Sequence, residues 1–194
     1  MKISSPLAAA LMLASLVGFQ AQAGTRQVLD ANGQSHTVPD DPQRVVVLSE
    51  LDLDSALTLG VQPVGTVNGR GQGTLPRYLL DKAGKAIQVV GDLDNPNLEK
   101  LIDLEPDLIR TGQTKPELLA LLQEIAPTVV TGNWGEPWKT VFNRSANVMN
   151  KEAEAKAFLA RYDARLAEAR SKLAKHQGEQ VSIVRWNPKG PSYM

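Results

Sequence analysis

The sequence of 194 residues contains no cysteine and only two histidines, His36 and His176. Without cysteine there are no disulfide bonds, no thiolate nucleophile and no metal site built on thiolates. The two histidines are far apart in the sequence, so they do not predict a zinc or manganese site. The three tyrosines are also scattered, which argues against a chelator-free iron site, and no axial haem ligand is well placed. Any iron that this chain binds should therefore arrive already wrapped in a chelator.

An excess of one charge is absent too, because Lys and Arg total 21 and Asp and Glu total 21. The sequence also shows no basic patch that would argue for nucleic-acid binding. The sequence has no Gly-x-Ser-x-Gly elbow and no phosphate-binding loop. The stretch NGRGQGT, residues 68–74, superficially resembles a dinucleotide fingerprint, but its spacing is wrong and it does not follow the first strand. We therefore expect a protein that is not an enzyme.

The first 23 residues have the pattern of a secretory signal peptide. Lys2 precedes an apolar run over residues 7–19, and Ala21-Gln22-Ala23 forms a small-x-small cleavage site. The run is too short for a membrane span, and a buried N-terminal helix is the less favoured alternative. Because no cysteine is available to carry a lipid, we expect a soluble periplasmic protein and not a lipoprotein.

Residues 24–150 alternate short apolar runs with helical patterns, which predicts an α/β lobe with an open, mostly parallel sheet flanked by helices. A hairpin is expected over residues 27–38, turning at Asn32-Gly33. The expected strands cover residues 45–48, 63–67, 87–90, 108–111 and 128–131, and the expected helices cover residues 51–59, 76–82, 97–104 and 116–125. Ligands bind such sheets outside the carboxyl ends of the strands.

Residues 151–177 contain a long stretch without Gly or Pro and a stripe of apolar residues at helical spacing, which predicts one long helix. It is longer than an ordinary crossover and is typical of a connection between two domains. Residues 178–194 then supply one strand, residues 181–186, with nothing to pair it. Because a lone strand leaves its backbone unsatisfied, we expect a truncated chain with an incomplete C-terminal lobe.

Three phrases resemble a known family, the periplasmic substrate-binding proteins of ABC importers for iron–siderophores, with cobalamin and haem relatives. They are DANGQSHTVPDDPQRVVVLSELDLDSALTLGVQPVG, VVGDLDNPNLEKLIDLEPDLI and LLQEIAPTVV. The resemblance implies two α/β lobes joined by a stiff helix, with the ligand in the cleft between them. Members that bind hydroxamate chelates have an arginine just before the Pro-Asn-Leu-Glu phrase. Here acidic and apolar residues occupy that place, which argues against a hydroxamate ligand.

The loops after the predicted strands, together with the start of the second lobe, provide the candidate ligand-binding residues. These are Ser49, Glu50, Asn68, Arg70, Gln113, Trp134, Arg185 and Tyr193. Arg70, in a glycine-rich loop, suits the oxygens of an anionic chelate, although a solvated loop charge is the alternative. Trp134 offers a flat apolar wall or packs at the edge of the lobe. Since Arg185 and Trp186 alternate along one strand, only one faces the cleft, and Arg185 is favoured.

The resemblance implies a protein without a cofactor that captures a ferric siderophore and delivers it, as a monomer, to an inner-membrane ABC permease. Cobalamin or haem is the alternative ligand. In this family the glutamate of the Pro-Asn-Leu-Glu phrase docks with arginines of the permease, which assigns that role to Glu99. On the helical pattern Leu98, Leu101 and Ile102 face the sheet, so Glu99 points outward. An ordinary solvated charge is the alternative for Glu99.

Overall fold

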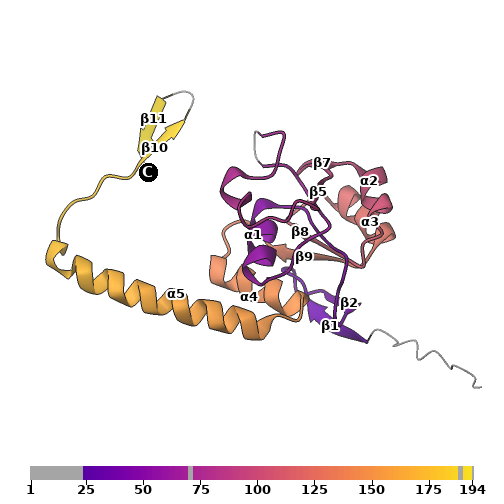
Figure 1. Cartoon of the computed structure of the whole chain (residues 1–194), viewed down its shortest axis with the longest axis horizontal. Coiled ribbons are helices and arrows are strands. Elements are labelled where there is room, and N and C mark those ends of the chain that lie inside the picture. Colours follow the sequence, from indigo (N-terminus) through magenta and orange to yellow (C-terminus); the bar gives the residue numbers. More distant parts are fainter. Residues whose placement is uncertain (1–23, 70–71, 188–189, 194) are drawn as a thin grey trace, which may run out of the picture.

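The computed structural model describes residues 24–69, 72–187 and 190–193. Its centre is a parallel sheet with the strand order β5-β4-β3-β8-β9. These strands are β3 (Val45–Val47), β4 (Gly65–Thr66), β5 (Gln88–Val89), β8 (Leu108–Gly112) and β9 (Thr128–Gly132). The helices packed on it are α1 (Glu50–Thr58), α2 (Leu98–Asp103), α3 (Pro116–Ile125) and α4 (Trp138–Val148) (Figure 1). The open, parallel α/β fold predicted from the sequence is therefore confirmed.

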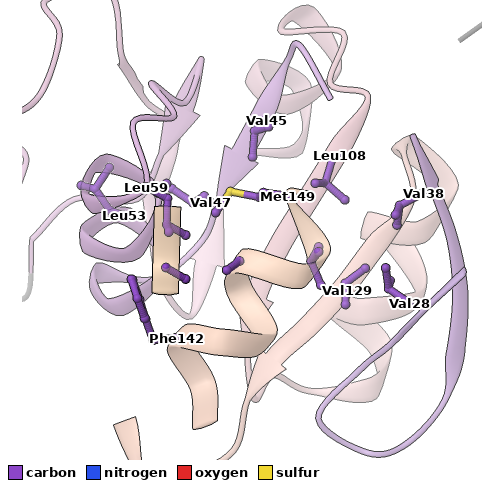
Figure 2. Packing of buried hydrophobic residues seen from close by; sticks show 14 of the residues in the cluster. Val28, Val38, Val45, Val47, Leu53, Leu59, Leu108, Val129, Phe142 and Met149 are labelled. Carbon is purple, nitrogen blue, oxygen red and sulfur yellow. The ribbon is translucent and has the colours of Figure 1, made fainter. Parts of the chain in front are cut away.

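Each face of the sheet has its own hydrophobic core, because successive residues of a strand point to opposite faces. Val45 and Val47 pack with α1 and α4 in one core, where Leu53 and Phe142 are also buried (Figure 2). Val46 and Leu48 lie in the other core with residues of α2 and α3. The uninterrupted apolar run of β3 thus follows from burial on both sides.

A β-hairpin precedes the sheet, formed by β1 (Thr25–Leu29) and β2 (Ser35–Pro39). Its inward residues Val28 and Val38 are buried in the core of the α1 and α4 face. The expected two-residue turn at Asn32-Gly33 is wrong, because residues 30–34 form a longer loop between the paired ends. One carboxylate oxygen of the buried Asp30 stabilises that loop by accepting the backbone N–H groups of Asn32 and Gln34.

Helix α2 begins where the sequence predicts, since the Asn97 side chain accepts the backbone N–H of Lys100 at 2.9 Å. Leu101 is completely buried against the sheet and Leu98 is half-buried. The expectation that Ile102 also faces the sheet is wrong, because 57% of this residue is exposed. A helix of six residues offers only a narrow buried face, which Leu101 occupies.

Two further helix predictions differ from the structure. Residues 76–82 form only a short 3₁₀ turn, η1 (Arg77–Leu79). Leu79 is buried there, but Tyr78 and Leu80 are exposed, so too little apolar surface is covered to stabilise a longer helix. Helix α4 was not predicted, although Trp138, Phe142 and Ala146 recur at helical spacing. The short strands β6 (Gly91–Asp92) and β7 (Asn95–Pro96) also form a hairpin that was not expected.

The predicted long helix is α5 (Glu152–Leu173), continued by the 3₁₀ turn η2 (Ala174–His176). Its first half contacts the lobe, through the buried Ala155, the half-buried Phe158 and Leu159, and the ring of Tyr162 against Trp138. The rest extends away from the lobe, and its far end leads to a second hairpin (Figure 1). Of the helices in the described part of the chain, none combines the length and the apolar character needed to cross a membrane.

That second hairpin corrects the expectation of an unpaired final strand. Strand β10 (Val184–Asn187) pairs antiparallel with β11 (Gly190–Tyr193), with Val184 opposite Tyr193. Each strand thereby satisfies backbone hydrogen-bonding groups along one edge. The helix prediction for residues 151–177 agrees with the structure, whereas its role as a connection between two lobes stays a prediction.

Candidate functional site

A cleft of about 970 Å³ opens at the carboxyl ends of the parallel strands. Its wall includes residues that directly follow β3, β4, β8 and β9, and residues of the β6–β7 hairpin that follows β5. Strand β3 lies between β4 on one side and β8 on the other, so the chain reverses its direction of progress across the sheet at this point. Open α/β sheets bind ligands at such a reversal, which makes this cleft the candidate site.

Five of the eight predicted ligand-binding residues line this cleft. They are Ser49, Glu50, Asn68, Gln113 and Trp134. Arg70 lies outside the described residues. Arg185 and Tyr193 belong to the β10–β11 hairpin, whose backbone lies apart from the lobe at the far end of α5, and their side chains lie outside the described part (Figure 1). The rule of strand ends therefore predicted loops that line the cleft, and the role of all eight residues in ligand binding stays a prediction.

The floor of the cleft holds a buried ion pair. The side chain of Asp52 at the start of α1 is 3% exposed, and one of its carboxylate oxygens accepts a hydrogen bond from Arg110 Nη2 at 2.7 Å. The same oxygen accepts the hydroxyl of Thr131. The other oxygen accepts the hydroxyl of Ser49 at 2.7 Å. One carboxylate thus joins the ends of β3, β8 and β9 beneath the cleft.

Arg110 is fully buried in β8, and its Nη1 donates to the sulfur of Met149 at 3.1 Å. Burial lowers the pKa of Arg110, while the charge and the hydrogen bond of Asp52 raise it. Because an unpaired guanidinium in this core would be very unfavourable, the ion pair is part of the fold. The sequence analysis did not identify Arg110, although its position directly after the apolar Leu108 and Ile109 in a predicted strand was an available signal.

Ser49 has a double structural role that limits what it can offer a ligand. Its hydroxyl oxygen accepts the backbone N–H of Asp52 at 3.0 Å and so caps α1. Its hydroxyl hydrogen is donated to the Asp52 carboxylate. A hydroxyl has one hydrogen and two lone pairs, so Ser49 has only one remaining lone pair, for a ligand that donates a hydrogen bond.

The rim of the cleft exposes Trp134, of which 83% is accessible to solvent. Glu136, two residues later, accepts the backbone N–H of Asn133 at 2.7 Å and pairs with Arg144 Nη2 at 2.8 Å. Arg144 also donates to the carbonyl oxygen of Thr131 at 2.8 Å. The Trp134 loop is thus braced from both ends, while the indole itself stays free of the core.

The same contacts act on the ionisation of Glu136. The hydrogen bond from Arg144, followed by that from the Asn133 backbone, holds the pKa of Glu136 below its usual value. Asn133 also donates from its side chain to the carbonyl oxygen of Ala31 and to Asn32, so the N-terminal hairpin supports this loop. The rim is ordered by polar contacts and not by apolar burial.

Helices α4 and α5 provide an aromatic wall that the sequence analysis did not foresee. Trp138, Phe142 and Phe158 line the cleft. The ring centroids of Phe142 and Phe158 are 5.2 Å apart, and those of Trp138 and Tyr162 are 5.0 Å apart in an edge-to-face contact. Within the described residues, no three His, Asp or Glu side chains converge as a metal site would require.

Glu99 lies elsewhere, on the exposed surface of α2. The same helix borders a shallow groove shared with α3, which includes the exposed Ile102 and Leu121. Neither the groove nor Glu99 contributes to the cleft wall described above. The cleft and the surface that carries Glu99 are therefore separate, and the docking role of Glu99 stays a prediction.

Comparison with known proteins connects this geometry with a family. A family model described as periplasmic binding protein matches residues 45–194. The probable siderophore-binding lipoprotein YfiY of Bacillus subtilis is 34% identical over 163 residues, which cover 84% of this chain and 50% of that protein. The putative ABC transporter substrate-binding lipoprotein YhfQ of the same organism is 30% identical, with 77% and 48% coverage. The chain thus spans about half the length of the curated relatives it matches.

Comparison of the fold with solved structures identifies relatives of the same kind. The crystal structure of Staphylococcus aureus SirA complexed with staphyloferrin B superposes with a TM-score of 0.71 and 30% sequence identity. The match covers 84% of this chain and 56% of SirA. A likeness of this extent shows that the lobe shares both its fold and its ancestry with siderophore-binding proteins.

The comparisons also correct one expectation. YfiY and YhfQ are named lipoproteins, which contradicts the inference that a protein of this kind is not a lipoprotein. That inference depended on the absence of cysteine, which describes only these 194 residues and does not decide how the whole protein is anchored. An extracytoplasmic location fits these relatives. The resemblance read from the sequence is confirmed, and the chain belongs to the periplasmic binding protein family.

Proposed function

We propose that this lobe forms one wall of a site that captures a ferric siderophore for delivery to an ABC permease. The observation that carries the proposal is the cleft at the reversal point of the sheet, in a lobe related to siderophore-binding proteins. Its open, partly aromatic wall suits an organic chelate that encloses its own iron. The protein acts as a binding protein and not as an enzyme, and it works as a monomer without a cofactor.

The organisation along the chain is part of the same proposal. Residues 1–23 act as a signal peptide for export to the periplasm, and residues 24–150 form the first lobe. Residues 151–177 connect it to a second lobe, of which residues 178–194 are the beginning. The ligand then lies between two lobes, and Arg185 and Tyr193 approach it from the second one.

A titration with ferric siderophores tests the capture function by comparing residues 24–194 with a protein that has both lobes. We expect residues 24–194 to show no tight quenching of tryptophan fluorescence by ferric siderophores, because half of the cleft wall is absent. The same lobe continued by a complete second lobe should bind one of these chelates with a sub-micromolar dissociation constant. Sub-micromolar binding by residues 24–194 would contradict the two-lobed site, and no binding by the two-lobed protein would contradict siderophore capture.

The external surface around Glu99 is the proposed docking site for the permease. Glu99 is exposed at the start of α2, and there it stabilises the fold by at most about 1 kcal/mol through the helix dipole. The neighbouring Ile102 and Leu121 are exposed apolar residues that a partner could cover. These features support a surface that the fold does not require and that a partner carrying arginine can contact.

Replacement of Glu99 by Ala separates docking from ligand binding. In the two-lobed protein, Glu99→Ala should leave the chelate affinity and the melting temperature nearly unchanged. Transport into vesicles that carry the cognate permease should fall, because one interface ion pair is lost. Asp103→Asn, at the other end of the same helix, is the control for loss of one surface charge. Undiminished transport by the Glu99 variant would remove this residue from the docking surface.

A further inference from the structure

The cleft wall has an unusual charge composition for a protein whose overall charge is balanced. Its carboxylate side chains are Glu50, Asp52, Asp54, Asp92, Asp94 and Glu136. Among the described residues that line the cleft, none is Lys or Arg. The described residues of the wall therefore carry only negative side-chain charges, some of which neighbouring groups neutralise.

Most of these carboxylates have partners within the protein. Asp52 pairs with Arg110 at 2.7 Å, Glu136 with Arg144 at 2.8 Å, and Asp54 with Lys82 at 3.8 Å. Glu50 has a partner as well. The three carboxylates of these ion pairs are therefore compensated, and Glu50 is not free either.

Asp92 and Asp94 differ from the other four. Both are exposed, and across the described residues neither takes part in an ion pair. Asp92 accepts the backbone N–H of Asn95 at 3.0 Å, which leaves its charge in place. The two residues flank Leu93 at the tip of the β6–β7 hairpin, so the fold directs an Asp-Leu-Asp tip to the cleft.

Tryptophan rings also line this cleft. Trp134 is 83% exposed and Trp138 is 47% exposed. Indole faces attract cations through the ring quadrupole, and carboxylates attract the same groups by charge. Both kinds of side chain therefore favour a ligand that carries a positive group, and neither favours an anionic chelate.

We infer that this lobe selects ferric chelates that carry a protonated amine, so that the bound complex is cationic and not anionic. The inference rests on the proposed function and specifies the substrate class of the same cleft. It competes with the expectation of an anionic chelate, which depends on Arg70 and stays a prediction because Arg70 lies outside the described residues. The Asp92–Asp94 tip provides the charge, and the exposed indoles provide the surface on which the ammonium group lies.

A series of chelates that differ only in charge tests this inference on residues 24–194 themselves. Desferrioxamine B loaded with Ga³⁺ carries one free ammonium group, its N-acetyl derivative is neutral, and its N-succinyl derivative is anionic. All three share the same hydroxamate groups, so any penalty against hydroxamates is common to the series and only the charge differs. Ga³⁺ replaces Fe³⁺ because it is diamagnetic, so that binding can be followed by the indole NMR signals of Trp134 and Trp138. Each signal is assigned by a Trp→Phe variant.

We expect the cationic chelate to shift both indole signals with the lowest dissociation constant, about threefold below the neutral one and tenfold below the anionic one. The difference should shrink in 0.5 M salt, because salt screens exposed charges. Asp92→Asn and Asp94→Asn should each weaken binding of the cationic chelate about two- to fivefold and leave the neutral one unchanged. Asp103→Asn removes an exposed carboxylate of α2 outside the cleft and is the matched control.

The other outcomes overturn the inference. Equal or tighter binding of the anionic chelate means that this wall does not select cations. Failure of all three chelates to shift the signals means that the lobe alone provides no selective surface. In either case siderophore capture is tested separately, by the fluorescence titration of the two-lobed protein.

Discussion

At the floor of the cleft the Asp52 and Arg110 side chains are almost completely shielded from water, whereas at its rim Trp134 exposes 83% of its surface. The floor pairs two charges and surrounds them with buried side chains such as Met149. The rim consists of exposed rings and carboxylates on loops, braced by partly exposed contacts such as that between Glu136 and Arg144. Both regions contain charged side chains, but those of the floor are buried and paired, whereas those of the rim are largely exposed to water.

The difference indicates that the floor of the cleft stabilises the fold and that the rim is available for ligand binding. A buried charge must keep its partner, so the floor holds the ends of three strands in one arrangement. An exposed side chain on a loop contributes little to folding, so the rim can vary with the ligand. We therefore expect substitutions at the floor to change stability first and substitutions at the rim to change binding first.

The largest expected effect is on stability and comes from the floor. Asp52→Asn should lower the free energy of unfolding of residues 24–194 by about 3–5 kcal/mol, because it leaves the buried Arg110 without a counter-charge. Urea denaturation followed by circular dichroism measures this loss. Asp54→Asn in the same helix is the control, since its pair with Lys82 is exposed and should cost less than about 1 kcal/mol. Equal effects of the two substitutions would contradict the division between floor and rim.

The second effect is on binding and comes from the rim. Trp134→Ala in the two-lobed protein should weaken siderophore binding about five- to thirtyfold, as for a central aromatic contact. Its free energy of unfolding should change by less than about 0.5 kcal/mol, because the indole has little contact with the core. Trp138→Ala is the informative comparison, since Trp138 stacks against Phe142 and Tyr162 and should lose stability as well. A Trp134 variant that loses stability but not affinity would reverse our assignment.

The smallest effect concerns the brace between the two regions. Glu136→Gln should lower the free energy of unfolding by about 0.5–1.5 kcal/mol at neutral pH, since it weakens one partly exposed charged hydrogen bond. In the parent chain the pKa of folded Glu136 lies below the usual value of 4.5. The stabilisation by Glu136 is therefore complete above pH 4.5. It is lost as the pH falls through the lower pKa of the folded state. Urea titrations should therefore show a larger difference from the parent chain at pH 7 than at pH 3.

Much of the fold follows from local patterns in the sequence. The apolar run of residues 45–48 predicts a buried parallel strand, and the alternation of short strands with helices predicts the open sheet. Asn97 and Pro116 mark helix starts that the structure retains. Such signals can be read from the sequence because each depends on neighbours within a few residues.

Other features could not be read in this way. Ile102 has the spacing of a buried residue but is exposed. The short helix α2 turns Leu101 toward the sheet, and Ile102 lies beside the buried face and not on it. The segment of residues 76–82 lacks the contacts that a helix needs, although its pattern permits one. The strand β10 finds a partner in β11, whereas the sequence analysis expected a final strand with nothing to pair it. In each case the outcome depended on the apolar surface or the partner that the fold supplied.

The sequence by itself determined the α/β class, the direction of the cleft at the strand ends, and the family to which the chain belongs. Only the tertiary structure decided that Asp52 faces inward to Arg110 while Trp134 faces outward, and that α4 and α5 add an aromatic wall. The reason is physical: periodicity records which face of an element is covered, but the partner of a buried charge lies 58 residues away in the chain. Such a pair is determined by the packing of strands and helices against one another.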